Sequence, residues 1–299
     1  MRIALAGEDR PAQRVAAALS EAGHLAAWFT AQYDQPRVAS LAGKAGADLH
    51  PDTGLSDGTA LKTTYDWLLT VNCARLVPAE VLDAYKGQAL NLHNGPLPAY
   101  AGRHVTQWGI RNGESRFAST IHYLEPGIDT GDVVAETWYD IGPTETGLSL
   151  FDRSFRLGTE LMLQVVETLA AGGPLPRRKQ DLTLRHLYRH KDALDGRIDW
   201  RWSPRQVVDF IRAGNYAPLS SPTYTAHLAH ADGSILVLRA EPIDAKGKPG
   251  EVLSAESEGL TVACGGGAVR LTQLKRDGKA CTAPGLYDPG TILPGRDGV

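Results

Sequence analysis

The stretch that decides the fold spans residues 88–131 and reads QALNLHNGPLPAYAGRHVTQWGIRNGESRFASTIHYLEPGIDTG. It opens with a short apolar run that continues into Asn91 and His93 and predicts a strand. Because side chains alternate along a strand, Asn91 and His93 project from the same face. A turn broken by Pro and Gly follows at residues 95–98. The polar pair therefore lies where the strand ends, which is where ligands bind in open α/β sheets.

A second apolar run, residues 119–124, leads into the glycine-shaped loop 125–131, which presents the carboxylate of Asp129. An amide, an imidazole and a carboxylate at the ends of loops make a plausible catalytic group. Taken singly, each residue has a simpler interpretation. Asn91 would cap a turn, His93 would be a satisfied polar group, and Asp129 would hold an Asx-turn. The catalytic interpretation depends on the three occurring together.

The size and composition of the chain suggest an ordinary globular protein. A length of 299 residues predicts two domains. The three cysteines are odd in number and far apart, which argues against a disulfide framework or a cysteine-based zinc site and fits a cytoplasmic location. We expect no signal peptide and no membrane span. The net charge of −3 argues against a dedicated nucleic-acid binder.

The first thirty residues predict the fold class. A strand at 2–6, a helix at 11–22 and a strand at 26–30 indicate an α/β, Rossmann-like, doubly wound and mostly parallel sheet. Gly7 is the only glycine of the first turn, so the dinucleotide fingerprint is absent and we expect no bound nucleotide cofactor. Further helices are predicted at 38–47, 79–85, 106–112, 203–212 and, with Thr144 as N-cap, up to Ala171, and further strands at 67–71 and 133–139.

The clearest break in the chain is GGPLPRRK, residues 172–179, which reads as a linker that ends in a basic run. From about residue 222 the pattern changes to short β-like runs separated by Gly-rich turns, and it predicts a small β barrel. The predicted strands are 223–228, 234–239, 250–253, 260–264 and 268–274.

The motifs of the central stretch resemble those of a known family. N-x-H at Asn91, a Leu-Pro turn, Y-x-G and G-I-D-T-G-D are together typical of the 10-formyltetrahydrofolate-dependent formyltransferases. These act on methionyl-tRNA, glycinamide ribonucleotide, amino sugars, or substrates of siderophore and peptide natural-product pathways. The resemblance is strong over residues 1–180 and weaker over the last third. It implies a catalytic domain at 1–180, a segment at 181–221 that packs on it, and an OB-like domain at 222–299.

Formyl transfer is the attack of an amine on a formyl carbon, whose carbonyl oxygen becomes an oxyanion. Asn91 would donate an amide N–H to that oxygen, and a protonated His93 would donate as well. Asp129 would favour the imidazolium and take the amine proton, directly or through a water. No side-chain nucleophile is required.

The resemblance also implies how the donor, 10-formyltetrahydrofolate, is held. Its pterin ring would lie between two segments that bind it largely through backbone groups. These segments supply Arg75, Leu76, Val77, Leu124, Gly127, Ile128 and Asp129. Arg75 has a surface salt bridge as its alternative role, and His122 is interpreted as structural. The histidines near Asp129 lack the spacing of a metal motif, so we expect no metal.

The acceptor is predicted from departures within the family. Asn94, Gly95 and His104 are candidates for binding it. The tRNA-formylating branch carries a basic insertion and a basic C-terminal module. Here the insertion is missing and the last third has few clustered cations. The best cationic candidates are Arg177, Arg178, Lys179, Arg185, Arg189 and Lys191. We therefore expect a small amine, derived from an amino acid such as hydroxyornithine or from an amino sugar, and no tight binding of nucleic acid. The alternatives are methionyl-tRNA formylation, hydrolysis of the donor, and a folate- or RNA-binding module without catalysis. A homodimer is left open.

Overall fold

The computed structural model describes residues 1–63, 65–192, 195–231 and 233–296. The chain forms two compact units, called unit 1 and unit 2. Unit 1 holds residues 1–102, 117–139 and 152–187, and unit 2 holds residues 103–116, 140–151 and 188–299. Unit 2 thus takes two segments from the first 180 residues. The sequence-based division at residues 180 and 221 stays a prediction.

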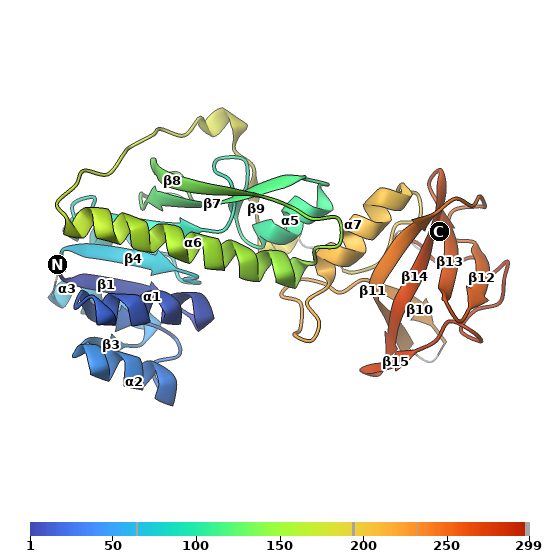
Figure 1. The fold of residues 1–299 in the computed structure, drawn as a ribbon, viewed down its shortest axis with the longest axis horizontal. Coiled ribbons are helices and arrows are strands. Elements are labelled where there is room, and N and C mark those ends of the chain that lie inside the picture. Colours follow the sequence, from blue (N-terminus) through green and yellow to red (C-terminus); the bar gives the residue numbers. More distant parts are fainter. Residues whose placement is uncertain (64, 193–194, 232, 297–299) are drawn as a thin grey trace. The chain divides into compact units, whose positions relative to one another are not determined.

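Unit 1 is built on a seven-stranded sheet with the order β3-β2-β1-β4-β5-β7-β8 (Figure 1). The five strands from β3 to β5 pair in parallel, and β7 runs antiparallel to β5. The predicted parallel-rich α/β sheet is confirmed. Its strands are β1 (Ile3–Gly7), β2 (Leu25–Phe29), β3 (Asp48–His50), β4 (Trp67–Val71), β5 (Ala89–His93), β7 (Arg116–Tyr123) and β8 (Val133–Asp140).

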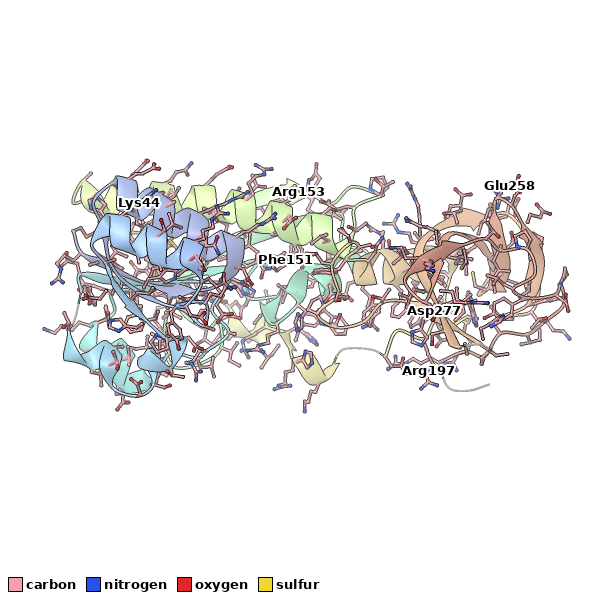
Figure 2. The ribbon with its side chains drawn as sticks, turned by 90° about the horizontal axis from the view of Figure 1, so that it is seen from below. Lys44, Phe151, Arg153, Arg197, Glu258 and Asp277 are labelled. Atoms are coloured by element: carbon pink, nitrogen blue, oxygen red, sulfur yellow. The ribbon has the colours of Figure 1, made fainter. Side chains whose placement is uncertain are left out.

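The helices of this sheet follow from amphipathic runs. They are α1 (Asp9–Glu21), α2 (Pro36–Ala45), α3 (Thr59–Lys62), α4 (Ala79–Ala84) and α6 (Gly147–Ala170). Gly158 brings α6 close to β5 and β7, because a Cβ there would lie 2.6 Å from Leu92 and 3.1 Å from Ser119. Arg153, on the same helix (Figure 2), lies over the Tyr139 ring of β8, with 5.1 Å between guanidinium carbon and ring centroid.

The N-terminus of α6 corrects one prediction. Thr144 does not cap this helix, which begins three residues later, at Gly147. The side-chain oxygen of Thr146 instead accepts the backbone N–H of Ser149 at 3.2 Å, and the Ser149 hydroxyl accepts the Thr146 N–H at 2.9 Å. Apolar periodicity located the helix but could not choose between two nearby threonines.

Unit 2 contains an antiparallel sheet with the order β10-β11-β14-β13-β12, and β15 pairs with β14. The strands are β10 (His227–His230), β11 (Gly233–Ile243), β12 (Val252–Glu256), β13 (Gly259–Cys264), β14 (Gly267–Arg276) and β15 (Lys279–Cys281). Trp200, Val207 and Phe210 share one hydrophobic core with residues of these strands. Helix α7 (Pro204–Gly214) also packs against α5 (Val105–Arg111). An OB-like barrel stays a prediction.

The end of the predicted linker is anchored in unit 1. Arg178 forms both hydrogen bonds of an antiparallel bridge with Val133, at 2.8 and 3.0 Å, and its guanidinium pairs with Glu136. The Arg177 guanidinium lies 3.6 Å from the centroid of the Tyr123 ring. These two arginines therefore hold the chain on the sheet.

In the part of the chain that the structure describes, no helix is long and apolar enough to cross a membrane.

Candidate active site

The site begins with a row of three side chains across the middle of the sheet. Strand β5 lies between β4 and β7, and its register sets Asn91 opposite Thr70 on one side and His122 on the other. Side chains opposite each other on neighbouring strands lie within contact distance. The Asn91 amide is therefore held from both sides.

Hydrogen bonds fix which way the Asn91 amide points. His122 Nδ1 lies 2.8 Å from the carbonyl oxygen of Tyr123, which can only accept, so Nδ1 carries a hydrogen. In the neutral ring Nε2 is then an acceptor, and Asn91 Nδ2 donates to it at 3.0 Å. The Thr70 hydroxyl donates to Asn91 Oδ1 at 2.7 Å. Among the described residues, the second hydrogen of Asn91 Nδ2 has no acceptor and is left for a ligand.

His93 lies at the end of β5 and is 5% exposed. Its Nε2 is 2.6 Å from the carbonyl oxygen of Tyr100, so this nitrogen donates to the backbone. Its Nδ1 faces Asp129 Oδ2 at 3.6 Å. Both ring nitrogens thus face oxygen acceptors. Because Nε2 is hydrogen-bonded to the Tyr100 carbonyl oxygen, Nδ1 is the ring nitrogen that is available to contact a substrate.

Asp129 sits in the loop of residues 125–131 between β7 and β8, called the Asp129 loop. Its φ of +54° lies in the left-handed region, which non-glycine residues adopt when their surroundings hold them there. Gly131 makes the loop tight, since a Cβ there would come within 1.9 Å of the Tyr123 carbonyl oxygen. The Asp129 carboxylate accepts the Gly102 N–H at 2.7 Å, and its other oxygen lies 3.4 Å from His122 Nε2.

The electrostatics around Asp129 keep it ionised. Burial raises the pKa of its carboxyl, whereas the facing His93 imidazole and the Gly102 amide lower it. His122 also lowers it in the form whose Nε2 carries a hydrogen and donates to Asp129 instead of accepting from Asn91, and together these groups outweigh burial. The net result is a pKa well below the ordinary value of 3.8. A carboxylate that stays charged beside an imidazole can hold an imidazolium or accept a proton when substrate is bound.

The two segments predicted to bind the pterin meet at one hydrophobic cluster. Val77 and Leu124 both pack against the cluster that includes Leu68, Val81 and Ala89. Leu76 is 71% exposed and Ile128 is 38% exposed, so both offer apolar surface to a ligand. Gly127, at φ +130°, forms the turn between Leu124 and Ile128.

Arg75 makes the salt bridge that was its alternative role. Its Nε lies 2.9 Å from Asp52 Oδ2, and its side chain is 36% exposed. The guanidinium is therefore oriented by a carboxylate of unit 1.

The three acceptor-binding candidates have different surroundings. Asn94 is half-buried just after β5, and Gly95 is buried with its carbonyl oxygen accepting the Thr120 hydroxyl at 2.8 Å. His104 belongs to unit 2, where its Nε2 lies 3.2 Å from His190 Nδ1. Burial, together with the charges of His190 and Arg103, lowers the pKa of His104 to about 4.

Sequence reasoning missed the residues that support the three predicted ones. His122, interpreted as structural, contacts both Asn91 and Asp129. Thr70 and Gly102 also touch them. Thr70 and His122 could be found only from the register in which β5 pairs with its neighbouring strands. Sequence periodicity does not give that register.

Across residues 1–63, 65–192, 195–231 and 233–296, no group of three or more His, Cys, Asp or Glu side chains could hold a metal ion.

The chain is similar to known proteins in its N-terminal half and in its C-terminal half. Residues 56–166 match the family model described as formyl transferase, and residues 191–287 match the one described as formyl transferase, C-terminal domain. Methionyl-tRNA formyltransferase of Anaeromyxobacter dehalogenans is 32% identical over 300 residues, which cover 93% of each chain. That of Ectopseudomonas mendocina is 30% identical and 98% of each chain is covered.

Solved structures share the fold at lower identity. An N-formyltransferase from Helicobacter canadensis, in complex with folinic acid and dTDP-3-aminofucose, superposes with a TM-score of 0.73 at 14% identity, covering 91% of this chain and 99% of that one. HypX from Aquifex aeolicus, in complex with tetrahydrofolic acid, gives 0.61 at 22% identity, covering 93% of this chain and 44% of that one.

Because relatives at least 30% identical match it over almost their whole length, the chain belongs to the formyl transferase family of folate-dependent enzymes.

Proposed function

We propose that this enzyme moves the formyl group of 10-formyltetrahydrofolate to the amine of a small metabolite, with Asn91, His93 and Asp129 as its catalytic residues. The observation that carries this proposal is the Asn91 amide. Thr70 and His122 fix its orientation, and one of its hydrogens has no partner among the described residues. Fixed donors of this kind stabilise an oxyanion without reorganising during the reaction.

The proposed reaction follows from these positions. The acceptor nitrogen attacks the formyl carbon, and the carbonyl oxygen becomes an oxyanion. This oxyanion accepts a hydrogen bond from the Asn91 N–H that has no partner among the described residues. Asp129, whose pKa is well below its ordinary value, faces His93 Nδ1 at 3.6 Å and takes up the amine proton directly or through a water. When the intermediate collapses, the bond to N10 of the folate breaks, and that nitrogen gains the proton that Asp129 took from the amine as the formamide forms.

The donor would lie against the exposed Leu76 and Ile128, over the cluster that Val77 and Leu124 join. The backbone of Arg75 and of the Asp129 loop, including Gly127, would hold the polar edge of the pterin. A binding surface of this kind leaves little side-chain signature. Its location beside Asp129 would bring the formyl carbon to the catalytic residues.

The charge distribution favours a small acceptor. Residues 222–299 carry eight Lys or Arg and nine Asp or Glu, so this part has no excess of positive charge. Arg177 and Arg178, the strongest basic run, contact Tyr123 and Glu136. Amines derived from amino acids, such as hydroxyornithine, and amino sugars are the acceptor classes we propose. Asn94, Gly95 and His104 stay candidates for binding them.

Formylation of methionyl-tRNA is the second candidate, because the relatives at least 30% identical carry that name. Binding tRNA requires several phosphates to be neutralised, and affinity then falls steeply with salt. We predict a dissociation constant of about 10⁻⁶ M or weaker for initiator tRNA at physiological salt, the range of non-specific association. The measurement is a gel shift at two salt concentrations, with a methionyl-tRNA formyltransferase as positive control. Tight, salt-steep binding would favour the tRNA substrate.

Hydrolysis of the donor is chemically close, since water in place of the amine would release formate from the same site. Formate release that does not depend on added amine would favour the hydrolase.

His122 provides a separate prediction about the oxyanion donor. Replacing His122 by Phe removes the acceptor that orients the Asn91 amide and keeps a ring of similar size. A lost hydrogen bond contributes roughly 1 kcal/mol, so we expect kcat to fall about fivefold with little change in folate binding. Thr70→Val should act in the same direction from the other side of the amide. Unchanged kcat in both variants would contradict the orienting role.

A further inference from the structure

We propose that Gln180 is a positioning residue that holds Asp129 in its working conformation. The inference rests on the catalytic role proposed for Asp129. The structural basis is the strap, defined as residues 177–187, which follows α6 and crosses the Asp129 loop. Two of its side chains, Gln180 and Arg185, donate hydrogen bonds to the backbone of the loop.

The side-chain amide of Gln180 donates two hydrogen bonds to the backbone of the loop. Its Nε2 donates to the carbonyl oxygens of Asp129, at 3.0 Å, and Gly131, at 2.6 Å. Both amide hydrogens are thereby used. Gln180 Oε1 is buried and has no hydrogen-bond partner within the described residues. A flipped amide would set this oxygen against two carbonyl oxygens, so only one orientation fits.

Arg185 adds a third contact to the same loop. Its Nη2 donates to the carbonyl oxygen of Ile128 at 2.6 Å. The strap thus binds the carbonyl groups of Ile128, Asp129 and Gly131. Because Asp129 has a left-handed φ of +54°, its backbone needs such support to keep that conformation.

The strap also supports the group that orients the carboxylate. Strand β9 (Leu187–Tyr188) pairs with β6 (Ala101–Gly102), and the Ala101 N–H donates to the carbonyl oxygen of His186 at 3.0 Å. Strand β6 ends at Gly102, whose N–H donates to the Asp129 carboxylate at 2.7 Å. One segment therefore fixes both the backbone of Asp129 and the partner of its side chain.

Loss of the Gln180 contacts has a defined consequence. A relaxed loop would move the carboxylate away from the Gly102 amide and from His93 and His122, the groups that lower its pKa. The pKa of the Asp129 carboxyl would then rise toward its ordinary range. The carboxylate would also be misplaced relative to the amine whose proton it accepts. Misplacement of a catalytic group by about 1 Å can cost about 10²-fold in rate.

The test compares Gln180→Met with Gln164→Met. Methionine keeps the length of glutamine and removes both donors. Gln164 is an exposed glutamine on α6 of the same unit, and it controls for the substitution itself. The first readout is the pH titration of the Asp129 carboxyl by ¹³C NMR, assigned by its loss in Asp129→Asn. In the wild type and in Gln164→Met, we expect Asp129 to stay ionised to the lowest pH at which the protein is folded. In Gln180→Met it should titrate at higher pH.

The second readout is kcat. Gln180→Met should lower kcat by about 10²-fold, and Gln164→Met should leave it unchanged. In an Asp129→Asn background, Gln180→Met should lower the residual rate by no more than about twofold, because its effect acts through the missing carboxylate. An effect that works only through general stability would be the same in both backgrounds.

The outcomes separate this inference from the proposed function. An unchanged Asp129 titration in a folded Gln180→Met would overturn the positioning role and leave the proposed function standing. A raised Asp129 pKa with full turnover in Asp129→Asn would instead remove Asp129 from catalysis. If Gln180→Met does not fold, Arg185→Met carries the same titration test through the Ile128 contact.

Discussion

Asp129→Asn is expected to lower kcat by about 10²–10⁴-fold, the range for a lost general acid or base. The substitution keeps the size of the side chain and can still accept the Gly102 N–H, so it removes mainly the charge. Without that charge, the side chain at position 129 can neither accept the amine proton nor hold a positive charge on His93. Folate affinity should change little, because the proposed donor surface uses the backbone of this loop and not the Asp129 carboxylate.

The measurement is steady-state kinetics with saturating donor, together with direct titration of folate binding. Asp140→Asn is the matched control, since its carboxylate on β8 has 85% of its side-chain surface exposed. Near-wild-type turnover in Asp129→Asn would show that the proposed proton acceptor is wrong.

Asn91→Ala is expected to lower kcat by about 10²–10³-fold, the usual loss for one oxyanion-hole donor. It removes the only group of the proposed site whose hydrogen is both fixed and unpartnered among the described residues. The effect should exceed that of His122→Phe, because the first variant deletes the donor and the second only loosens it. Folate binding by Asn91→Ala should stay close to that of the wild type. If turnover survives, Asn91 has no part in the transition state.

Much of the catalytic geometry follows from local sequence. Alternation along β5 gives Asn91 and His93 a common face. The Pro- and Gly-rich turn that follows ends this strand just after His93. The glycines around Asp129 predict the tight loop that the structure contains. The strand alternation and the tight turns depend on residues that are close together in the sequence. A short stretch of sequence is therefore enough to predict them.

The supporting contacts depend on tertiary structure and could not be predicted. His122 meets Asn91 only because β7 pairs with β5 in one register. Gln180 reaches Asp129 across 51 residues of sequence. The sequence places Arg177 and Arg178 in a basic run at the end of a linker, and in the fold an aromatic ring and a carboxylate of the sheet contact them. Composition alone cannot distinguish a cation in water from one that packs on a distant strand.

The most direct test of the account is a mass-spectrometric screen for formyl transfer. The purified enzyme is incubated with 10-formyltetrahydrofolate and with a panel of amino-acid-derived amines, amino sugars and methionyl-tRNA. Asn91→Ala and Asp129→Asn serve as parallel controls. We predict that a small amine gains the mass of one formyl group, that both variants make far less product, and that methionyl-tRNA stays unmodified. Formylation of methionyl-tRNA with no product from any small amine would contradict the proposed acceptor, and equal product from the two variants would contradict the proposed site.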